Sequence, residues 1–189
     1  MKKFLITNFI AFSLTGTIAG HVYAGWRPSE ADTATAHEVD ITQTYAAKTI
    51  TDFKNYYPYL DIYFEKAYGY AVFPTVTKGG LGIGAAHGKG DVFEKGSFIG
   101  TANMTQVTFG AQIGGQQYSE IIFFKDKVAL EDFKANKVKL GAQASAIAAT
   151  SGVSADAAYS EGVAVFTLSK TGLMYEASIA GQKFTFKPK

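Results

Sequence analysis

The chain has 189 residues, no cysteine and a formal net charge of +2, with 18% charged residues. This length is sufficient for one domain with a hydrophobic core. Because cysteine is lacking, we expect no disulfide, no thiol nucleophile and no acyl-anchored lipoprotein N-terminus. The charged residues form no dense basic stripe, so the composition argues against a nucleic-acid-binding protein.

The first 24 residues have the features of a secretory signal peptide. Two lysines follow Met1, an apolar stretch covers residues 4–18, and the small residues Val22 and Ala24 occupy the −3 and −1 positions of a cleavage site. A transmembrane anchor is the alternative, but the apolar run is shorter than the roughly 20 residues that a span needs. We therefore expect cleavage between Ala24 and Gly25, and a soluble periplasmic or secreted protein.

Residues 25–68 are predicted to form a helical part. Apolar residues recur every three or four positions over residues 29–56, a stretch with neither glycine nor proline, which predicts a helix. Pro58 favours the first turn of a second, shorter helix that ends before Gly69. This part carries seven acidic and four basic residues, so it is net acidic.

Residues 69–189 are predicted to form a mainly β part, because the apolar period changes to two after Gly69. We predict strands at residues 70–73, 81–85, 107–114, 121–124, 138–146, 163–168 and 173–186, with Pro74 ending the first strand and a short helix at 128–136. The predicted fold class is α+β, in a single domain over residues 25–189. N-terminal helices would pack on a glycine-rich antiparallel sheet that is curled into a barrel or a sandwich.

The segment GGLGIGAAHGKG, residues 79–90, is the densest glycine cluster. It resembles two phosphate-binding motifs and fits neither. Ile83 stands where a P-loop needs its first glycine, and Gly90 stands where it needs Ser or Thr. His87 stands where a dinucleotide-binding motif needs its third glycine. Glycines at alternate positions instead predict strands with one bare face, which a helix or the opposite wall of the sheet can approach closely. We expect the N-terminal helices to cover that face.

We predict no catalytic residues, no metal site and no cofactor. After removal of the signal peptide only His37 and His87 remain, without the close spacing of metal ligands. A hydrolase that pairs carboxyl groups among Glu120, Glu161 and Glu176 is the enzymatic alternative, because glycosidases use such pairs.

Three segments carry a resemblance to a known family: residues 67–90, FGAQIGGQQYSEIIFF at 109–124, and GLMYEASIAGQKF at 172–184. In this order they resemble the SYLF lipid-binding domain family, over roughly residues 50–186. Many members have a tryptophan and a proline where this chain has GSFIGTANM at 96–104, so the match is incomplete there.

The resemblance implies a non-enzymatic envelope protein whose partner is phospholipid, a membrane surface or another amphiphile. Lys78, Lys89 and Lys95 flank the glycine-rich segment, and we predict that they form a basic rim for lipid head groups. Solubility and protection of strand edges is the alternative role for these lysines. The alternative function is a structural or protein-interaction module of the cell envelope, with an envelope protein as partner.

The predicted cleavage site gives a direct test of export. We expect the exported protein to have an intact mass that corresponds to a chain beginning at Gly25. Mass spectrometry of the protein recovered from the periplasm or the medium measures this, and a recovered species that retains residues 1–24 would contradict the prediction.

Overall fold

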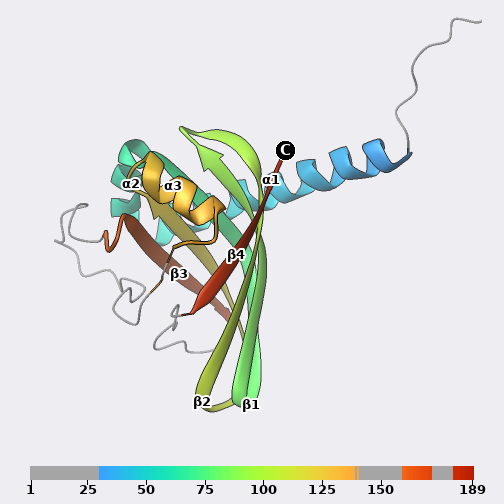
Figure 1. Cartoon of the computed structure of the whole chain (residues 1–189), viewed down its shortest axis with the longest axis vertical. Helices are drawn as coiled ribbons and strands as arrows, with labels where there is room; N and C mark the ends of the chain where they lie inside the picture. The colour runs from blue at the N-terminus through green and yellow to red at the C-terminus, as the bar shows by residue number, and fades with distance from the viewer. Residues whose placement is uncertain (1–29, 139, 141–158, 172–180) are drawn as a thin grey trace, which may run out of the picture.

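A computed structural model describes residues 30–138, 140, 159–171 and 181–189 of the chain (Figure 1). The predicted signal peptide and most of the predicted strand at 138–146 lie outside these residues. The described elements are, in chain order, α1 (Glu30–Tyr56), η1 (Pro58–Leu60), α2 (Asp61–Lys66), β1 (Gly69–Glu94), β2 (Ser97–Phe124), α3 (Lys127–Lys134), β3 (Val163–Thr171) and β4 (Gln182–Pro188). The predicted α+β class is confirmed.

The predicted helices are present with nearly the predicted bounds. Helix α1 is described from Glu30, next to the predicted start, and ends at Tyr56, as the 3.6-residue period indicated. Pro58 begins the short 3-10 helix η1, which leads directly into α2. Helix α3 begins after Asp126, whose Oδ1 accepts a 2.9 Å hydrogen bond from the backbone N–H of Ala129.

Strands β1 and β2 form one long antiparallel pair, from Gly69 opposite Phe124 to Glu94 opposite Ser97. They are joined by the two-residue turn Lys95–Gly96, in which both residues have positive φ. The prediction that Pro74 ends the first strand is wrong. Proline has no N–H to donate, and the ladder accommodates it by a register shift between Phe73 and Val76.

The β1–β2 pair folds over on itself near residue 82. A Cβ atom at Gly80 would collide with the backbone of Ile83 and Gly84, so β1 reverses its direction within a few residues. Residues 109–113 of β2 lie opposite only 81–83 of β1, so β2 follows a longer path around this bend. Figure 1 shows the bend at the lower end of the long axis, with α2 and α3 at the upper end.

Folding over produces two layers that lie face to face. Residues 69–81 of β1 and 113–124 of β2 form the first layer with β3, which pairs with residues 117–124 of β2. Residues 83–94 and 97–109 form the second layer with β4, which pairs with residues 100–106 of β2. We call these the helix-covered layer and the open layer.

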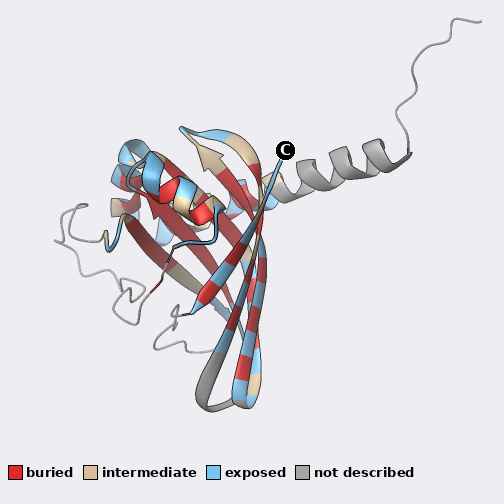
Figure 2. Cartoon of the chain, viewed as in Figure 1, coloured by how far each residue is buried: buried red, intermediate tan, exposed pale blue. Residues whose placement is uncertain are grey.

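The core has two parts, which Figure 2 shows as buried positions along the strands. Between the layers, Ala71, Phe73, Ile122 and Phe124 pack with residues of the open layer such as Met104 and Phe184. Helix α3 closes this space at the end away from the bend, where the Phe133 ring lies 4.7 Å from that of Phe184. On the outer face of the helix-covered layer, Phe53, Leu60 and Tyr63 of the N-terminal helices cover Phe123 and Phe166.

The expectation that the N-terminal helices cover the glycine-rich face is wrong. That face is covered by the other layer of the sheet: a Cβ atom at Gly88 would lie 2.9 Å from Cγ2 of Val76, and one at Gly90 would lie 2.7 Å from Cδ1 of Phe73. The close approach of the opposite layer, rather than of a helix, is therefore the reason why these positions must lack side chains.

The expected barrel is not formed by the described strands. Strands β3 and β4 both pair with β2, and no described strand pairs with the outer edge of β1. The predicted barrel or sandwich is therefore confirmed only in part: the sheet is folded into two facing layers, but the described strands do not close it.

The close approach of the layers predicts a position-dependent effect of adding one methyl group. Gly90→Ala should lower the free energy of unfolding by about 1–3 kcal/mol, because the new Cβ meets Phe73 and the carbonyl of Val72. Gly79→Ala is the matched control, because its Cβ would make only an ordinary 3.7 Å contact and the change should stay within about 0.5 kcal/mol. Urea unfolding measures both, and equal stabilities of the two variants would contradict the two-layer packing.

Candidate functional site

The structure does not bring Lys78, Lys89 and Lys95 together as one rim. Lys78 lies in the helix-covered layer and is only 9% exposed, and burial lowers the pKa of its ammonium group. Lys89 is exposed on the open layer. Lys95 lies in the β1–β2 turn, with its Nζ 5.2 Å from the centre of the Tyr68 ring. Six residues of extended strand, roughly 20 Å, separate it from Lys89. The assignment of these lysines to lipid binding stays a prediction.

Large apolar side chains are exposed together at the bend. Leu81, Ile83 and Val107 are 78%, 63% and 59% exposed, and we call these three residues the bend surface. Ile83 lies opposite Phe109 in the ladder, and Val107 lies opposite Ala85, two residues further from the bend. The bend surface therefore continues from β1 onto β2 at one extremity of the molecule (Figure 1).

Charged residues are absent from the sequence that forms the bend. Residues 79–86 and 96–119 contain no Asp, Glu, Lys or Arg. This gap in the charge pattern is the signal by which the bend surface could have been found from the sequence. Alternation alone identified residues 81–85 as a strand, but it could not tell which face of that strand would stay exposed.

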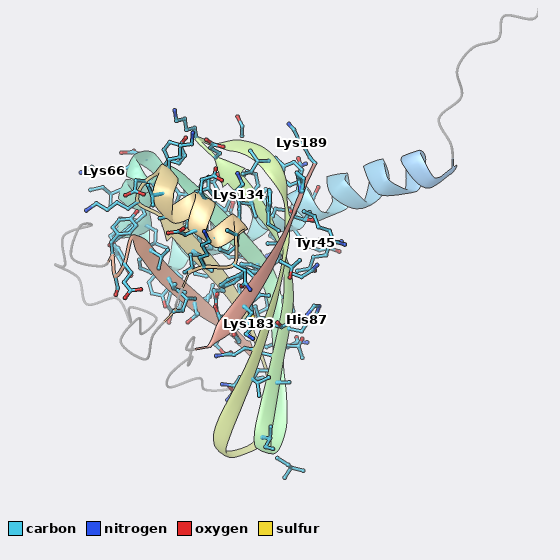
Figure 3. The ribbon with its side chains drawn as sticks, viewed as in Figure 1. Tyr45, Lys66, His87, Lys134, Lys183 and Lys189 are labelled. Atoms are coloured by element: carbon cyan, nitrogen blue, oxygen red, sulfur yellow. The ribbon has the colours of Figure 1, made fainter. Side chains whose placement is uncertain are left out.

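Polar and cationic rows follow the bend surface on the outer face of the open layer. His87, Thr105 and Lys183 lie opposite one another across three strands, and Figure 3 shows His87 and Lys183 at a similar height above the bend. All three side chains are exposed. The exposed Lys89 lies two residues further along β1. Polarity thus rises along this face from an apolar end to a row that includes lysine.

A second polar group is enclosed between the layers. The carboxyl group of Glu120 is fully buried, and its Oε2 accepts a 2.9 Å hydrogen bond from Nε2 of Gln182. Its Oε1 has no hydrogen-bond partner within the part of the chain that the structure describes. Burial raises the pKa of Glu120 to about 7. Burial also raises the pKa of the neighbouring Tyr118 hydroxyl, and the charge of Glu120 adds to this effect.

The carboxyl groups considered for a hydrolase lie in different environments. Glu161 is exposed in the turn before β3, where the carbonyl of Gly162 accepts a 2.9 Å hydrogen bond from the N–H of Lys125, just after the end of β2 and five residues beyond Glu120. Glu176 lies outside the described residues. Glu120 and Glu161 are therefore not brought together as a pair.

Two open hollows in the described part of the chain differ in size. One of about 270 Å³ is lined by Tyr45 of α1 and by Pro74, Thr75, Lys89, Gly90 and Asp91 of β1. This is below the 300–1,000 Å³ of typical small-molecule sites, whereas a second hollow of about 420 Å³, lined by residues 136–138, 140 and 181–183, lies within that range. Among the described residues, no group of three His, Cys, Asp or Glu side chains is arranged to hold a metal ion. No helix in the described ranges has the length and apolar character needed to cross a bilayer.

The C-terminal part of the chain is similar to a known protein family. Residues 105–189 match the family described as "Ysc84: Las17-binding protein actin regulator". This match confirms, over these residues, the resemblance to the SYLF family seen in the sequence.

A curated relative extends this likeness toward the N-terminus. The chain is 29% identical over 152 residues to "Beta cell expansion factor A" of Aeromonas veronii. The match covers 79% of this chain and 58% of the relative, so the chain spans little more than half of that protein.

The buried carboxyl group predicts a pH dependence of stability. The folded state raises the pKa of Glu120 from 4.5 to about 7, so it holds a proton that the unfolded chain releases. The free energy of unfolding should therefore fall as pH rises from about 4.5 to about 7, by up to about 3 kcal/mol from this group.

Glu120→Gln removes the titrating group and should remove this part of the fall in stability. Urea unfolding at a series of pH values measures the effect. Glu161→Gln is the matched control, because Glu161 is exposed, and its profile should follow that of the wild type. An unchanged slope in Glu120→Gln would mean that Glu120 is not buried with its proton.

Proposed function

We propose that this chain is a non-enzymatic exported protein that binds phospholipid membranes, in the periplasm or outside the cell. The observation that carries the proposal is the bend surface, where Leu81, Ile83 and Val107 are exposed together on an uncharged, projecting end. Contiguous exposed apolar side chains of this kind mark surfaces that bind a membrane, a protein or a ligand.

The resemblance to the SYLF lipid-binding domain family supports the same function. The description of the matched family, a Las17-binding actin regulator, favours a second candidate, a protein-interaction module. In that case an exposed strand edge or the bend surface would receive a protein partner. The two candidates differ in whether purified lipid alone is bound.

The energetics of a membrane contact follow from the side chains at the bend. Removing a leucine, isoleucine or valine side chain from water contributes about 1.5–3 kcal/mol. Each lysine near an anionic surface adds about 1 kcal/mol. Since three such apolar side chains are exposed and few lysines lie near them, apolar contact should supply most of the binding free energy.

Co-sedimentation with vesicles tests the proposed function. We expect the mature protein to sediment with phosphatidylglycerol vesicles, and less with phosphatidylcholine vesicles. Raising salt should weaken binding only modestly, because few charges take part and exposed charges are screened within about 8–10 Å. If the protein sediments with neither vesicle at any salt concentration, the protein-interaction module becomes the better account.

A further inference from the structure

We propose that the bend of the β1–β2 pair is the membrane-contact site, and that it enters the interfacial region of an anionic bilayer end-on, with Lys183 at the level of the phosphate groups and Lys89 further out, facing the anionic surface. This inference rests on the proposed lipid-binding function and adds the site, the orientation and the lipid class.

The spacing of side chains along β1 matches the interfacial region of a bilayer. With a rise of about 3.3 Å per residue, Ala85 and its partner Val107 lie roughly 10 Å from the centre of the bend. His87 lies at roughly 16 Å and Lys89 at roughly 23 Å along the strand. Surface-bound segments bury their apolar faces by about 5–10 Å at the boundary of head groups and acyl chains. The apolar rows thus reach this depth, and the first polar row stays above it.

The backbone at the bend is compatible with shallow insertion and not with a deep one. Strands β1 and β2 stay paired from Gly79 opposite Gly115 to Ala85 opposite Val107, apart from the register shift at the bend itself. Much of their backbone hydrogen bonding is therefore satisfied within the pair. The outer edges are different: among the described strands, β3 pairs with β2 only from Gln117, and β4 only up to Gln106. Unpaired strand edges do not occur in hydrocarbon, so the bend should remain at the interface.

The charge pattern selects an anionic surface. Lys89 and Lys183 are exposed on the face that follows the bend surface, and residues 79–90, 96–119 and 182–188 contain no acidic residue. A bilayer surface rich in anionic lipid would attract both lysines, and the nearest acidic residue of β1, Asp91, is buried on the side of Lys89 away from the bend. A projecting apolar end flanked by cations suits contact with a flat anionic surface. An extended peptide would need a groove instead.

A tryptophan reporter at the bend tests insertion. The native Trp26 is replaced by phenylalanine, and tryptophan is introduced either as Leu81→Trp or, as a control, as Val128→Trp. Val128 is a comparably exposed apolar residue, 69% exposed against 78% for Leu81, on helix α3 at the far end of the molecule. With phosphatidylglycerol vesicles we expect a blue shift and quenching by brominated lipid for the Leu81→Trp protein. Bromine nearer the head group should quench more than bromine deep in the acyl chain. The Val128→Trp protein should show neither effect.

Two pairs of variants test the apolar and cationic contributions. Leu81→Asp/Ile83→Asp should weaken partitioning into phosphatidylglycerol vesicles at least ten-fold, whereas Val128→Asp should change it less than two-fold. Lys89→Glu/Lys183→Glu should weaken it several-fold and reduce the preference for phosphatidylglycerol over phosphatidylcholine. Lys66→Glu/Lys127→Glu makes the same change in charge on α2 and α3, away from the bend, and should have a smaller effect. All these positions are exposed, and the urea unfolding curve of each variant, compared with that of the wild type, shows whether a loss of binding reflects a loss of folding.

The outcomes separate this inference from the proposed function. If the wild type binds vesicles but the Leu81→Trp protein shows no shift and no quenching, the membrane site lies elsewhere and only this inference fails. Equal binding by Leu81→Asp/Ile83→Asp and the wild type has the same meaning. If the wild type binds no vesicle of either composition, the lipid-binding function fails and the inference fails with it.

Discussion

The two-layer form of this protein depends on the contact between one half of β1 and the other. Gly88 and Gly90 face Val76, Val72 and Phe73 so closely that a single additional carbon atom would collide. This approach is possible only because the facing residues lack side chains. It fixes the bend, brings Phe184 of β4 to within 6.0 Å of the Phe73 ring in the other layer, and leaves the space that α3 closes at the opposite end.

The same constraint divides the molecule into a packed end and an exposed end. Large aromatic side chains gather where the helices meet the layers, as in the contacts of Phe133 with Phe124 and Phe184. Toward the bend the interior positions become small or polar, with Ala86, Gly88 and Gln106 in place of aromatic rings. At the bend itself the large side chains point outward. A protein that needed only stability would gain nothing from this arrangement, since exposed leucine and isoleucine favour association.

Local patterns predicted the helices well, because α1 and α3 follow a 3.6-residue period and have clear ends. They also predicted alternating strands at the glycine-rich segment. They could not predict that β1 continues past Pro74, since a register shift that tolerates proline depends on the partner strand. They could not choose between a helix and the opposite layer as the cover for the glycines, because both need the same small residues.

The candidate site shows the same limit. Lys78, Lys89 and Lys95 lie close in the sequence, but the bend and the turn distribute them over the interior, the open layer and the far end. The burial of Glu120 depends on β4, more than 60 residues away, which supplies Gln182. By contrast, the charge-free stretch at 96–119 is visible in the sequence, and its meaning became clear once the bend placed it at an extremity.

The central claim is that a folded-over strand pair presents its bend to a membrane, and a depth profile along β1 tests it most directly. The chain has no cysteine, so single cysteines can be introduced at the exposed positions 77, 79, 81, 83, 85, 87 and 89 and labelled with a nitroxide. Power-saturation measurements on phosphatidylglycerol vesicles then give the immersion of each label. The account predicts the deepest labels at 81 and 83, with immersion falling on both sides, so that 77 and 87 are similarly shallow. A profile that changes steadily from 77 to 89, or one with no immersion at 81 and 83, would contradict it.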